Sequence, residues 1–106
     1  DPRAFAQDGM ALVLAQEMIQ LKLDQALDPV YRRSLYMPFM HSESTRIHEV
    51  ALQLFEALDN PTVLDYELRH KVIIDRFGRY PHRNQLLGRE STAEELTFLT
   101  QPDSSF

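Results

Sequence analysis

The sequence predicts an all-α domain made of antiparallel helical hairpins, for three reasons. Apolar residues recur at helical spacing over most of the chain, and prolines and polar caps mark where successive helices begin. No window alternates apolar and polar residues regularly enough to indicate a β-strand. The 106 residues, 43% of them hydrophobic and 25% charged, suffice for one domain and are too few for two. We therefore expect one domain over residues 1–106, with about five helices joined by short connections.

The first predicted helix runs from Asp8, which is suited to be its N-cap, to about Lys22. Apolar residues at helical spacing give this helix a broad apolar face that includes Leu12 and Ile19. A face of that width indicates burial on two sides.

Prolines and caps mark the next two helices. Asp28-Pro29 is typical of a helix start, because the fixed φ of proline suits the first turn. Pro38 disfavours the helical conformation at the residue before it and cannot donate a backbone hydrogen bond, so we expect a stop or kink near residues 36–39. The third helix is predicted over residues 42–58, with Ser42 as its N-cap.

The last two helices have equally clear start signals. Asn60-Pro61 begins a helix that extends to Phe77, and Gly78 supplies the left-handed residue that ends it. Ser91 and Glu94 match a capping box, in which each side chain accepts a hydrogen bond from the backbone of the other, so a short helix should follow. Helix pairs of this size are typical of a helical-repeat array, although the sequence contains no clean 34-residue repeat.

The composition excludes several classes of protein. Eleven Lys and Arg residues against 16 Asp and Glu residues give a net charge of −5, which argues against a surface that coats nucleic acid or anionic lipid. The chain has no cysteine, so it forms no disulfide, Cys-ligated metal site or thiol nucleophile, and it fits a reducing compartment. Since we find neither a run of 18 apolar residues nor a signal peptide, we expect no membrane span and a cytoplasmic location.

Charge is unevenly distributed along the chain. Residues 69–89 carry a net charge of +5, and the remainder carries −10. At the centre of this basic segment, residues 76–84 place three arginines, a histidine, an asparagine and two aromatic residues around a predicted turn. Guanidinium groups bind carboxylates and phosphates through paired hydrogen bonds. We therefore expect a pocket for a small anionic ligand or an acidic peptide terminus, and no extended nucleic acid, which the acidic remainder would repel.

The expected pocket combines this basic turn with two histidines from elsewhere in the chain. His41 precedes the Ser42 cap, and His70 lies on the apolar stripe of the helix that ends at Phe77. The expected ligand-binding residues are His41, His70, Arg76, Arg79, His82, Arg83 and Asn84. The alternative is that the arginines pair with nearby acidic side chains and serve only to attach the C-terminal segment to the other helices.

Two other functions stay open. A hydrolase or lyase would use a histidine with Glu43 or Asp75 as an acid–base pair. An interaction scaffold would instead hold a partner helix or peptide in a groove between hairpins. We predict no metal and no cofactor, because no two histidines have the spacing of helical metal ligands and no glycine-rich phosphate loop is present. The segment His48-Glu49-Val50-Ala51-Leu52 begins like a zinc-protease motif, but Leu52 stands at the second ligand position.

Several longer segments resemble a known family. They are Met37-Pro38-Phe39-Met40-His41-Ser42-Glu43, Arg69-His70, residues 76–84, Leu87-Gly88-Arg89-Glu90-Ser91-Thr92 and Ser104-Ser105-Phe106. Together they are similar to the bacterial domain-of-unknown-function 924 family, over nearly the whole chain. The resemblance implies an α-helical fold similar to tetratricopeptide arrays, in agreement with the predicted hairpins, and it implies no function.

The family pattern also implies that the domain is longer than this chain. In family members the stretch that matches Arg3-Ala4-Phe5-Ala6 lies well inside the domain, so the resemblance implies that residues 1–106 are a C-terminal portion. The broad face of residues 8–22 would then have covered further helices. We expect Leu12 and Ile19 to be exposed, or to be buried in a homo-oligomer.

Overall fold

The computed structural model describes residues 5–106, and every regular element in that range is helical. Six α-helices and two short 3₁₀-helices follow one another along these residues. They are α1 (Asp8–Gln20), η2 (Leu23–Ala26), α2 (Pro29–Met40), α3 (Thr45–Ala57), α4 (Pro61–Phe77), η3 (Pro81–Arg83), α5 (Asn84–Leu87) and α6 (Ala93–Phe98). The predicted all-α class is confirmed. Arg3 and Ala4, from the stretch that resembles the family, lie outside the described residues.

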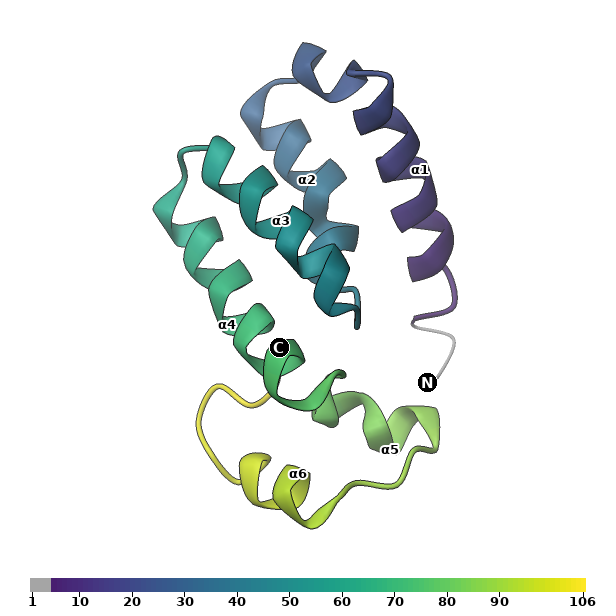
Figure 1. Cartoon of the computed structure of the whole chain (residues 1–106), viewed down its shortest axis with the longest axis vertical. Coiled ribbons are helices and arrows are strands. Elements are labelled where there is room, and N and C mark those ends of the chain that lie inside the picture. The colour runs from purple at the N-terminus through teal and green to yellow at the C-terminus, as the bar shows by residue number, and fades with distance from the viewer. Residues whose placement is uncertain (1–4) are drawn as a thin grey trace.

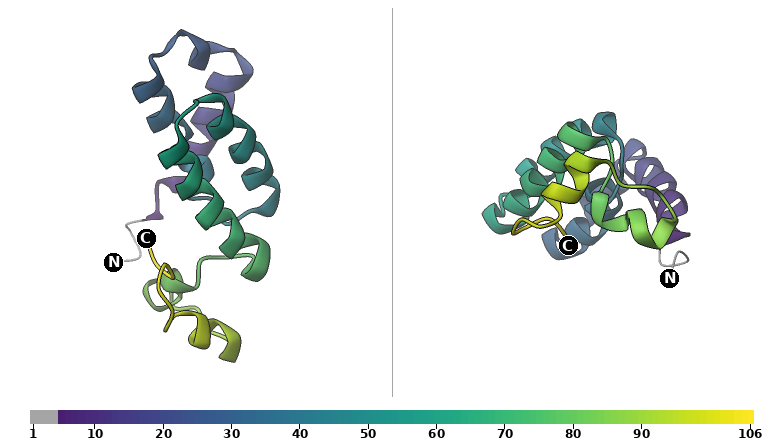
Figure 2. Two further views of the ribbon diagram at one scale, coloured as in Figure 1. Left: turned by 90° about the vertical axis from the view of Figure 1, so that its left-hand side faces the viewer. Right: turned by 90° about the horizontal axis from the view of Figure 1, so that it is seen from below.

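The four longer helices lie side by side in the order of the sequence (Figure 1). α1 packs on α2, α2 on α3 and α3 on α4, and short connections reverse the chain between them. α5 and α6 lie at one end of this array, beyond the C-terminal end of α4 (Figures 1 and 2). The tail then returns from α6, so that Phe106 lies beside His70 of α4.

Two of the predicted helix starts are confirmed. Pro29 and Pro61 each occupy the first turn of their helix. The side chain of Asn60 accepts a hydrogen bond from the N–H of Val63 at 3.3 Å, which satisfies a donor that the helix itself leaves free. Gly78 ends α4 with a φ of 73°, a conformation that costs glycine little. These signals are reliable because each depends on local backbone sterics.

Two other predicted starts are displaced by one or two residues. Gln7, and not Asp8, is the N-cap of α1. Ser44, and not Ser42, is the N-cap of α3, where its hydroxyl accepts a backbone hydrogen bond. The carbonyl of Ser42 instead accepts a hydrogen bond from Nε2 of His48 at 2.7 Å. A buried side chain therefore holds the connection before α3 in place, which helix propensity does not reveal.

The capping box of α6 is also displaced by one residue. The N–H of Thr92 donates to Oε1 of Glu95 at 2.9 Å, and the N–H of Glu95 donates to Oγ1 of Thr92 at 3.1 Å. Ser91 instead accepts a hydrogen bond from the side-chain amide of Asn84 at 3.0 Å. The predicted box of Ser91 and Glu94 is wrong because this tertiary partner takes the hydroxyl that would have capped the helix.

α2 continues through Pro38 and ends at Met40, one residue beyond the range 36–39 expected for a stop or kink. Pro38 leaves the carbonyl of Ser34 without its helical donor. Ser34 is exposed, so water can satisfy that carbonyl. Phe39 and Met40 are buried, and their packing stabilises the last turn beyond the proline.

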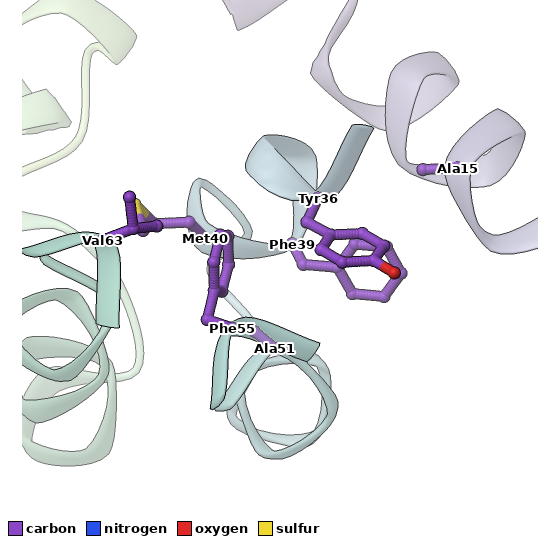
Figure 3. Close-up of a cluster of buried hydrophobic side chains, with 7 residues drawn as sticks. All are labelled: Ala15, Tyr36, Phe39, Met40, Ala51, Phe55 and Val63. Carbon is purple, nitrogen blue, oxygen red and sulfur yellow. The ribbon is translucent and has the colours of Figure 1, made fainter. Parts of the chain in front are cut away.

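The main core lies between the four longer helices. It is a cluster of seven buried side chains, drawn in Figure 3: Ala15, Tyr36, Phe39, Met40, Ala51, Phe55 and Val63. The rings of Tyr36 and Phe55 meet edge to face, with centroids 6.1 Å apart. α2 supplies three of the seven side chains and is therefore the central helix of this core.

The exposed apolar surface of α1 is not the one expected from the sequence. Leu12 and Ile19 are half-buried against the main core, within a single chain. The reason is that Ala15 of α1 contacts the core. Leu12 precedes Ala15 by three residues and Ile19 follows it by four, so both lie on the same side of the helix as Ala15. The large apolar side chains that α1 does expose are Met10, Val13 and Leu14. Despite them, no helix within residues 5–106 has the length and apolar character that crossing a membrane requires.

A second set of buried contacts attaches the C-terminal segment to the array. The hydroxyl of Tyr80 donates a hydrogen bond to the carbonyl of Met40, at the end of α2, at 2.5 Å. Nε2 of His48 in α3 lies 3.0 Å from the same hydroxyl, and Nδ1 of His48 lies 2.8 Å from Oε2 of Glu67 in α4. Tyr80, His48 and Glu67 are all buried. One tyrosine thus connects the C-terminal segment to three helices.

Tyr80→Phe should lower the free energy of unfolding by about 1–3 kcal/mol, because it leaves the buried carbonyl of Met40 without its donor. Urea denaturation measures the difference. Tyr66→Phe is the matched control: Tyr66 is 49% exposed, and its loss of a hydroxyl should change the free energy by less than about 0.5 kcal/mol. Equal stability of the two variants would show that the Tyr80 hydroxyl does not hold the segment.

Candidate functional site

Four of the side chains expected at a ligand site line one hollow in the structure. His41, His70, His82 and Arg83 lie on the wall of a hollow of about 420 Å³. The rest of its lining consists of Phe5, Asp8, Tyr80, Leu86 and Phe106. The hollow therefore lies where the end of α2, the middle of α4, η3 and the C-terminal tail meet.

The local structure explains how these side chains reach the hollow. His41 is the C-cap of α2, so it stands where that helix ends. His70 precedes the buried Ile73 by three residues and lies on the same inward face of α4. Gly78 then turns the chain so that η3 begins below the array, and η3 carries the histidine and arginine of the basic turn.

Arg83 is the cation at this hollow. It is only 8% exposed, and its guanidinium carbon lies 4.4 Å from the ring centroid of Phe5 and 4.8 Å from that of Tyr80. The rings attract the cation through their π faces and keep water away from it. Nε of Arg83 is buried and has no hydrogen-bond partner among the described residues. A buried N–H without an acceptor is costly, so a negative charge close to this guanidinium would be stabilising.

The three imidazoles around Arg83 are neutral at neutral pH. Loss of water around the ring lowers the pKa of His41 and of His82, and the charge of Arg83 lowers both further. Burial lowers the pKa of His70 to about 4. Nδ1 of His70 lies 2.6 Å from the carbonyl of Tyr66, which can only accept, so this nitrogen carries the proton. The imidazoles thus add hydrogen-bonding groups to the hollow without adding charge.

The hollow continues on two sides. His41, His70 and Phe106 also line a hollow of about 570 Å³ between α2 and α4. His41, Arg83 and Asp8 line a third hollow, of about 360 Å³, next to α1. His41 therefore stands at the junction of all three.

Arg76 and Arg79 do not reach these hollows, although the sequence analysis places them at the ligand site. Arg76 donates to Oε1 of Glu94 at 3.1 Å. Arg79 donates from Nε and Nη2 to the two carboxylate oxygens of Glu95, at 2.9 and 2.7 Å. The hydrogen bonds from Arg79 lower the pKa of Glu95 to about 2. Two acidic residues of α6 therefore bind these arginines, which is the alternative that the sequence analysis leaves open.

Asn84 also lies away from the hollow, because it is buried in a network that holds the C-terminal segment. Its amide nitrogen donates to Ser91, and its oxygen accepts from Nε of Arg89 at 2.9 Å. Arg89 donates to both carboxylate oxygens of Glu43, at 2.8 and 3.0 Å, and the N–H of Tyr80 donates to the same carboxylate at 2.6 Å. Burial opposes ionisation of Glu43, but these hydrogen bonds outweigh it and hold its pKa below the usual value.

The acid–base pairs considered from the sequence are not formed. Glu43 and Asp75 are each bound to a basic side chain, at 2.8 and 2.7 Å. Among residues 5–106, the one imidazole–carboxylate contact within 4 Å joins His48 and Glu67, and both side chains are fully buried. The same residues contain no group of three or more His, Cys, Asp or Glu side chains placed to hold a metal ion. A substrate in the hollow would therefore meet no such pair.

The His48–Glu67 pair is built as part of the interior. Nε2 of His48 faces the carbonyl of Ser42 and so carries a proton. Burial raises the pKa of Glu67, and its hydrogen bond with His48 opposes that rise only in part. Oε1 of Glu67 has no hydrogen-bond partner among the described residues, and its other oxygen, Oε2, faces Nδ1 of His48. The pair contributes no net charge to the core.

Sequence reasoning missed the aromatic part of the hollow. The ring of Phe106 stacks on that of His70, with centroids 3.8 Å apart and planes at 22°. Phe5 and Tyr80 flank Arg83, and Asp8 lies on the same wall. The basic turn of residues 76–84 pointed to Tyr80, and the resemblance of the closing Ser104-Ser105-Phe106 segment to the family pointed to Phe106, but neither signal gave a position in the fold.

Comparison with known proteins finds relatives without assigned functions. The sequence model of a family described as "Bacterial protein of unknown function (DUF924)" matches residues 1–103. A solved structure, described as "Structure of Protein of Unknown Function ATU0120 from Agrobacterium tumefaciens", is similar to this chain with a TM-score of 0.84 and 38% sequence identity. The match covers 90% of this chain and 53% of that one, so the chain spans about half the length of this relative. No curated protein matches the sequence.

The free energy of unfolding should fall as the pH is lowered from 6.5 to about 4. The pKa of His70 is about 4 in the folded chain against an ordinary value of 6.5, so in this window the unfolded chain binds a proton that the folded chain does not. His70→Phe removes this group. Between pH 7 and pH 4, the free energy of unfolding of this variant should therefore fall by roughly 2–3 kcal/mol less than that of the original chain. Urea denaturation at a series of pH values tests this. Parallel profiles would contradict it.

Glu95→Gln should cost about 1–3 kcal/mol of stability, because Glu95 is buried, caps α6 and accepts two hydrogen bonds from Arg79. Glu94→Gln is the matched control, since Glu94 pairs with Arg76 while both side chains are about half exposed, and it should cost less than about 1 kcal/mol. Thermal or urea unfolding of the two variants compares them directly. The same cost for both would mean that Arg79 is not a structural residue.

Proposed function

The chain belongs to the bacterial DUF924 family of proteins of unknown function, and from this premise we propose that it is a binding module for a small anionic ligand. The ligand would lie in the hollow around Arg83. The observation that carries the proposal is the buried guanidinium of Arg83 on the wall of this hollow, whose Nε has no acceptor among residues 5–106. The site consists of Arg83 with His41, His70 and His82. Arg76, Arg79 and Asn84 are not part of it.

The charge on Arg83 favours an anion more strongly here than at the surface. Aromatic rings on both sides exclude water, and the effective dielectric constant around the guanidinium is therefore lower than in solvent. A carboxylate can accept hydrogen bonds from the guanidinium of Arg83 and from the N–H groups of neutral His41 and His82, whereas the one N–H of His70 is already donated to the carbonyl of Tyr66. The other arginines of the basic segment lack this advantage, because each of them already pairs with a carboxylate of the chain: Arg69, Arg76, Arg79 and Arg89.

The hollow favours a singly charged ligand. Asp8 lines the same wall as Arg83, so one negative charge of the protein already lies near the site. The histidines are neutral and do not offset a second charge on the ligand. A carboxylate should therefore bind better than a phosphate dianion. The carboxylate of a small molecule and that of a peptide terminus share this chemistry, and titration with acetate and with a short acidic peptide separates the two.

A binding role is favoured over an enzyme for a geometric reason. Catalysis by a histidine and a carboxylate needs the pair within hydrogen-bonding distance beside an open cavity. The pair that exists, His48 and Glu67, does not line the hollow. The histidines that do line it have no carboxylate partner within 4 Å among the described residues.

Arg83→Met should weaken the binding of acetate by roughly tenfold or more, because it removes the cation and its hydrogen bonds while keeping a side chain of similar length. Binding is measured by titration of the ¹⁵N-labelled chain followed by NMR. Arg76→Met is the matched control: this arginine is half exposed, lies away from the hollow, and its loss should leave acetate binding unchanged.

A second readout does not depend on whether Arg83→Met folds. In the original chain, acetate should shift the ring signals of His41, His70 and His82, and leave the guanidinium signals of Arg76 and Arg79 in place. Acetate that binds the Arg83→Met variant as tightly as the original chain, or that shifts only the Arg76 and Arg79 signals, would overturn the proposal.

A further inference from the structure

We propose that the hollow contains a subsite for an aromatic ring beside the anion site, that Phe106 occupies this subsite in the free chain, and that the ligand is an aromatic carboxylate. The inference rests on the proposed function of the Arg83 site and specifies its ligand class. Phe106 and Arg83 line the same hollow of about 420 Å³.

The position of Phe106 is that of a stacked ligand. Its ring lies on the face of His70 with centroids 3.8 Å apart and an angle of 22° between the planes. The ring of His82 meets it nearly at right angles, with centroids 6.2 Å apart. Stacked and edge-to-face contacts are the two arrangements that aromatic pairs prefer. Two imidazoles from α4 and η3 therefore form a pair of walls that fits a planar ring.

The tail that carries Phe106 is weakly attached within the described residues. Its hydrogen bond, from Oγ of Ser104 to the carbonyl of Leu99, is 3.3 Å long, and its ion pair, between Asp103 and Arg69, is 3.7 Å long and exposed. Phe106 itself is 49% exposed. Displacing this ring therefore costs the protein little.

The space around the ring also fits an incoming ligand. Phe106 lines both the hollow that contains Arg83 and the hollow of about 570 Å³ between α2 and α4, so its ring stands between the two. When the ring leaves, the two hollows become continuous along His41 and His70. A ligand ring that replaces it gains the stack on His70 and keeps its carboxylate within the hollow that Arg83 lines.

The chemistry of the walls selects the ligand class. Five aromatic or imidazole rings line the Arg83 hollow in addition to Phe106, namely Phe5, His41, His70, Tyr80 and His82. Such rings favour a planar ring over an aliphatic chain. Arg83 supplies one positive charge and Asp8 one negative charge, so a single carboxylate suits the site better than a phosphate ester. The probes are therefore phenylacetate, acetate and inorganic phosphate.

Phe106→Ala tests the inference. It vacates the subsite, so phenylacetate should bind the variant about threefold to tenfold more tightly than the original chain, whereas the affinity for acetate should not change. Tyr31→Ala is the matched control: it removes another exposed aromatic ring, one that lies outside all of these hollows, and should alter neither affinity. Isothermal titration or NMR titration gives the dissociation constants.

A structural readout accompanies the affinities. Loss of the stacked ring in Phe106→Ala should move the ring-proton signals of His70 downfield, and saturating phenylacetate, but not acetate, should move them back. This measurement also shows whether the probe ring takes the place that Phe106 leaves.

The outcomes separate this inference from the proposed function. If acetate and phenylacetate bind with equal affinity, and Phe106→Ala changes neither, the Arg83 site stands and the aromatic subsite is overturned. Weaker binding of phenylacetate to Phe106→Ala also overturns the inference, because Phe106 would then be a wall of the site and not its occupant. If none of the three probes binds any of the chains, both proposals fail.

Discussion

The buried hydroxyl of Tyr80 donates a hydrogen bond to the carbonyl of Met40, and this contact positions the rest of the C-terminal segment. Burial raises the pKa of this hydroxyl, so it remains a donor throughout the ordinary pH range. The ring of the same residue lies edge-on to His70, with centroids 5.6 Å apart, and 4.8 Å from the guanidinium of Arg83. A single buried phenol therefore fixes the distance between α4 and η3. The shape of the hollow follows from that distance.

The basic segment of the sequence serves two purposes, and burial separates them. Arg76, Arg79 and Arg89 each reach a carboxylate of the chain, and these pairs attach α6 and the connection before it to the helices above. Arg83 differs because it lies between two aromatic rings and its Nε has no acceptor in the part of the chain that the structure describes. The candidate site thus contains an arginine of the basic segment that forms no ion pair within 4 Å with an acidic side chain among the described residues. Its neighbours give it hydrogen-bonding groups and aromatic surface but little further charge.

Local signals in the sequence predict most of the fold. Asn60-Pro61 and Gly78 mark the start and end of α4 correctly, because proline and glycine restrict or relax the backbone whatever surrounds them. Predictions fail where a polar group has a competing partner elsewhere in the fold. Ser91 is drawn to Asn84, and the capping box moves to the next residue. A different limit applies to Leu12 and Ile19, which are half-buried, since periodicity shows that a helix has a broad apolar face but not how much of it the core covers.

The sequence by itself determined the all-α class, the order of the helices and the presence of a basic turn with neighbouring histidines, because these depend on spacing and on residue type. The tertiary structure alone decided that Arg76, Arg79 and Arg89 bind carboxylates of the chain while Arg83 lies between aromatic rings, and it alone placed His41, His70, His82 and Phe106 around one hollow. The physical reason is that ion pairing and ring stacking depend on distances between residues far apart in the chain, such as the 3.8 Å between the rings of His70 and Phe106. Only the packing of the helices sets those distances.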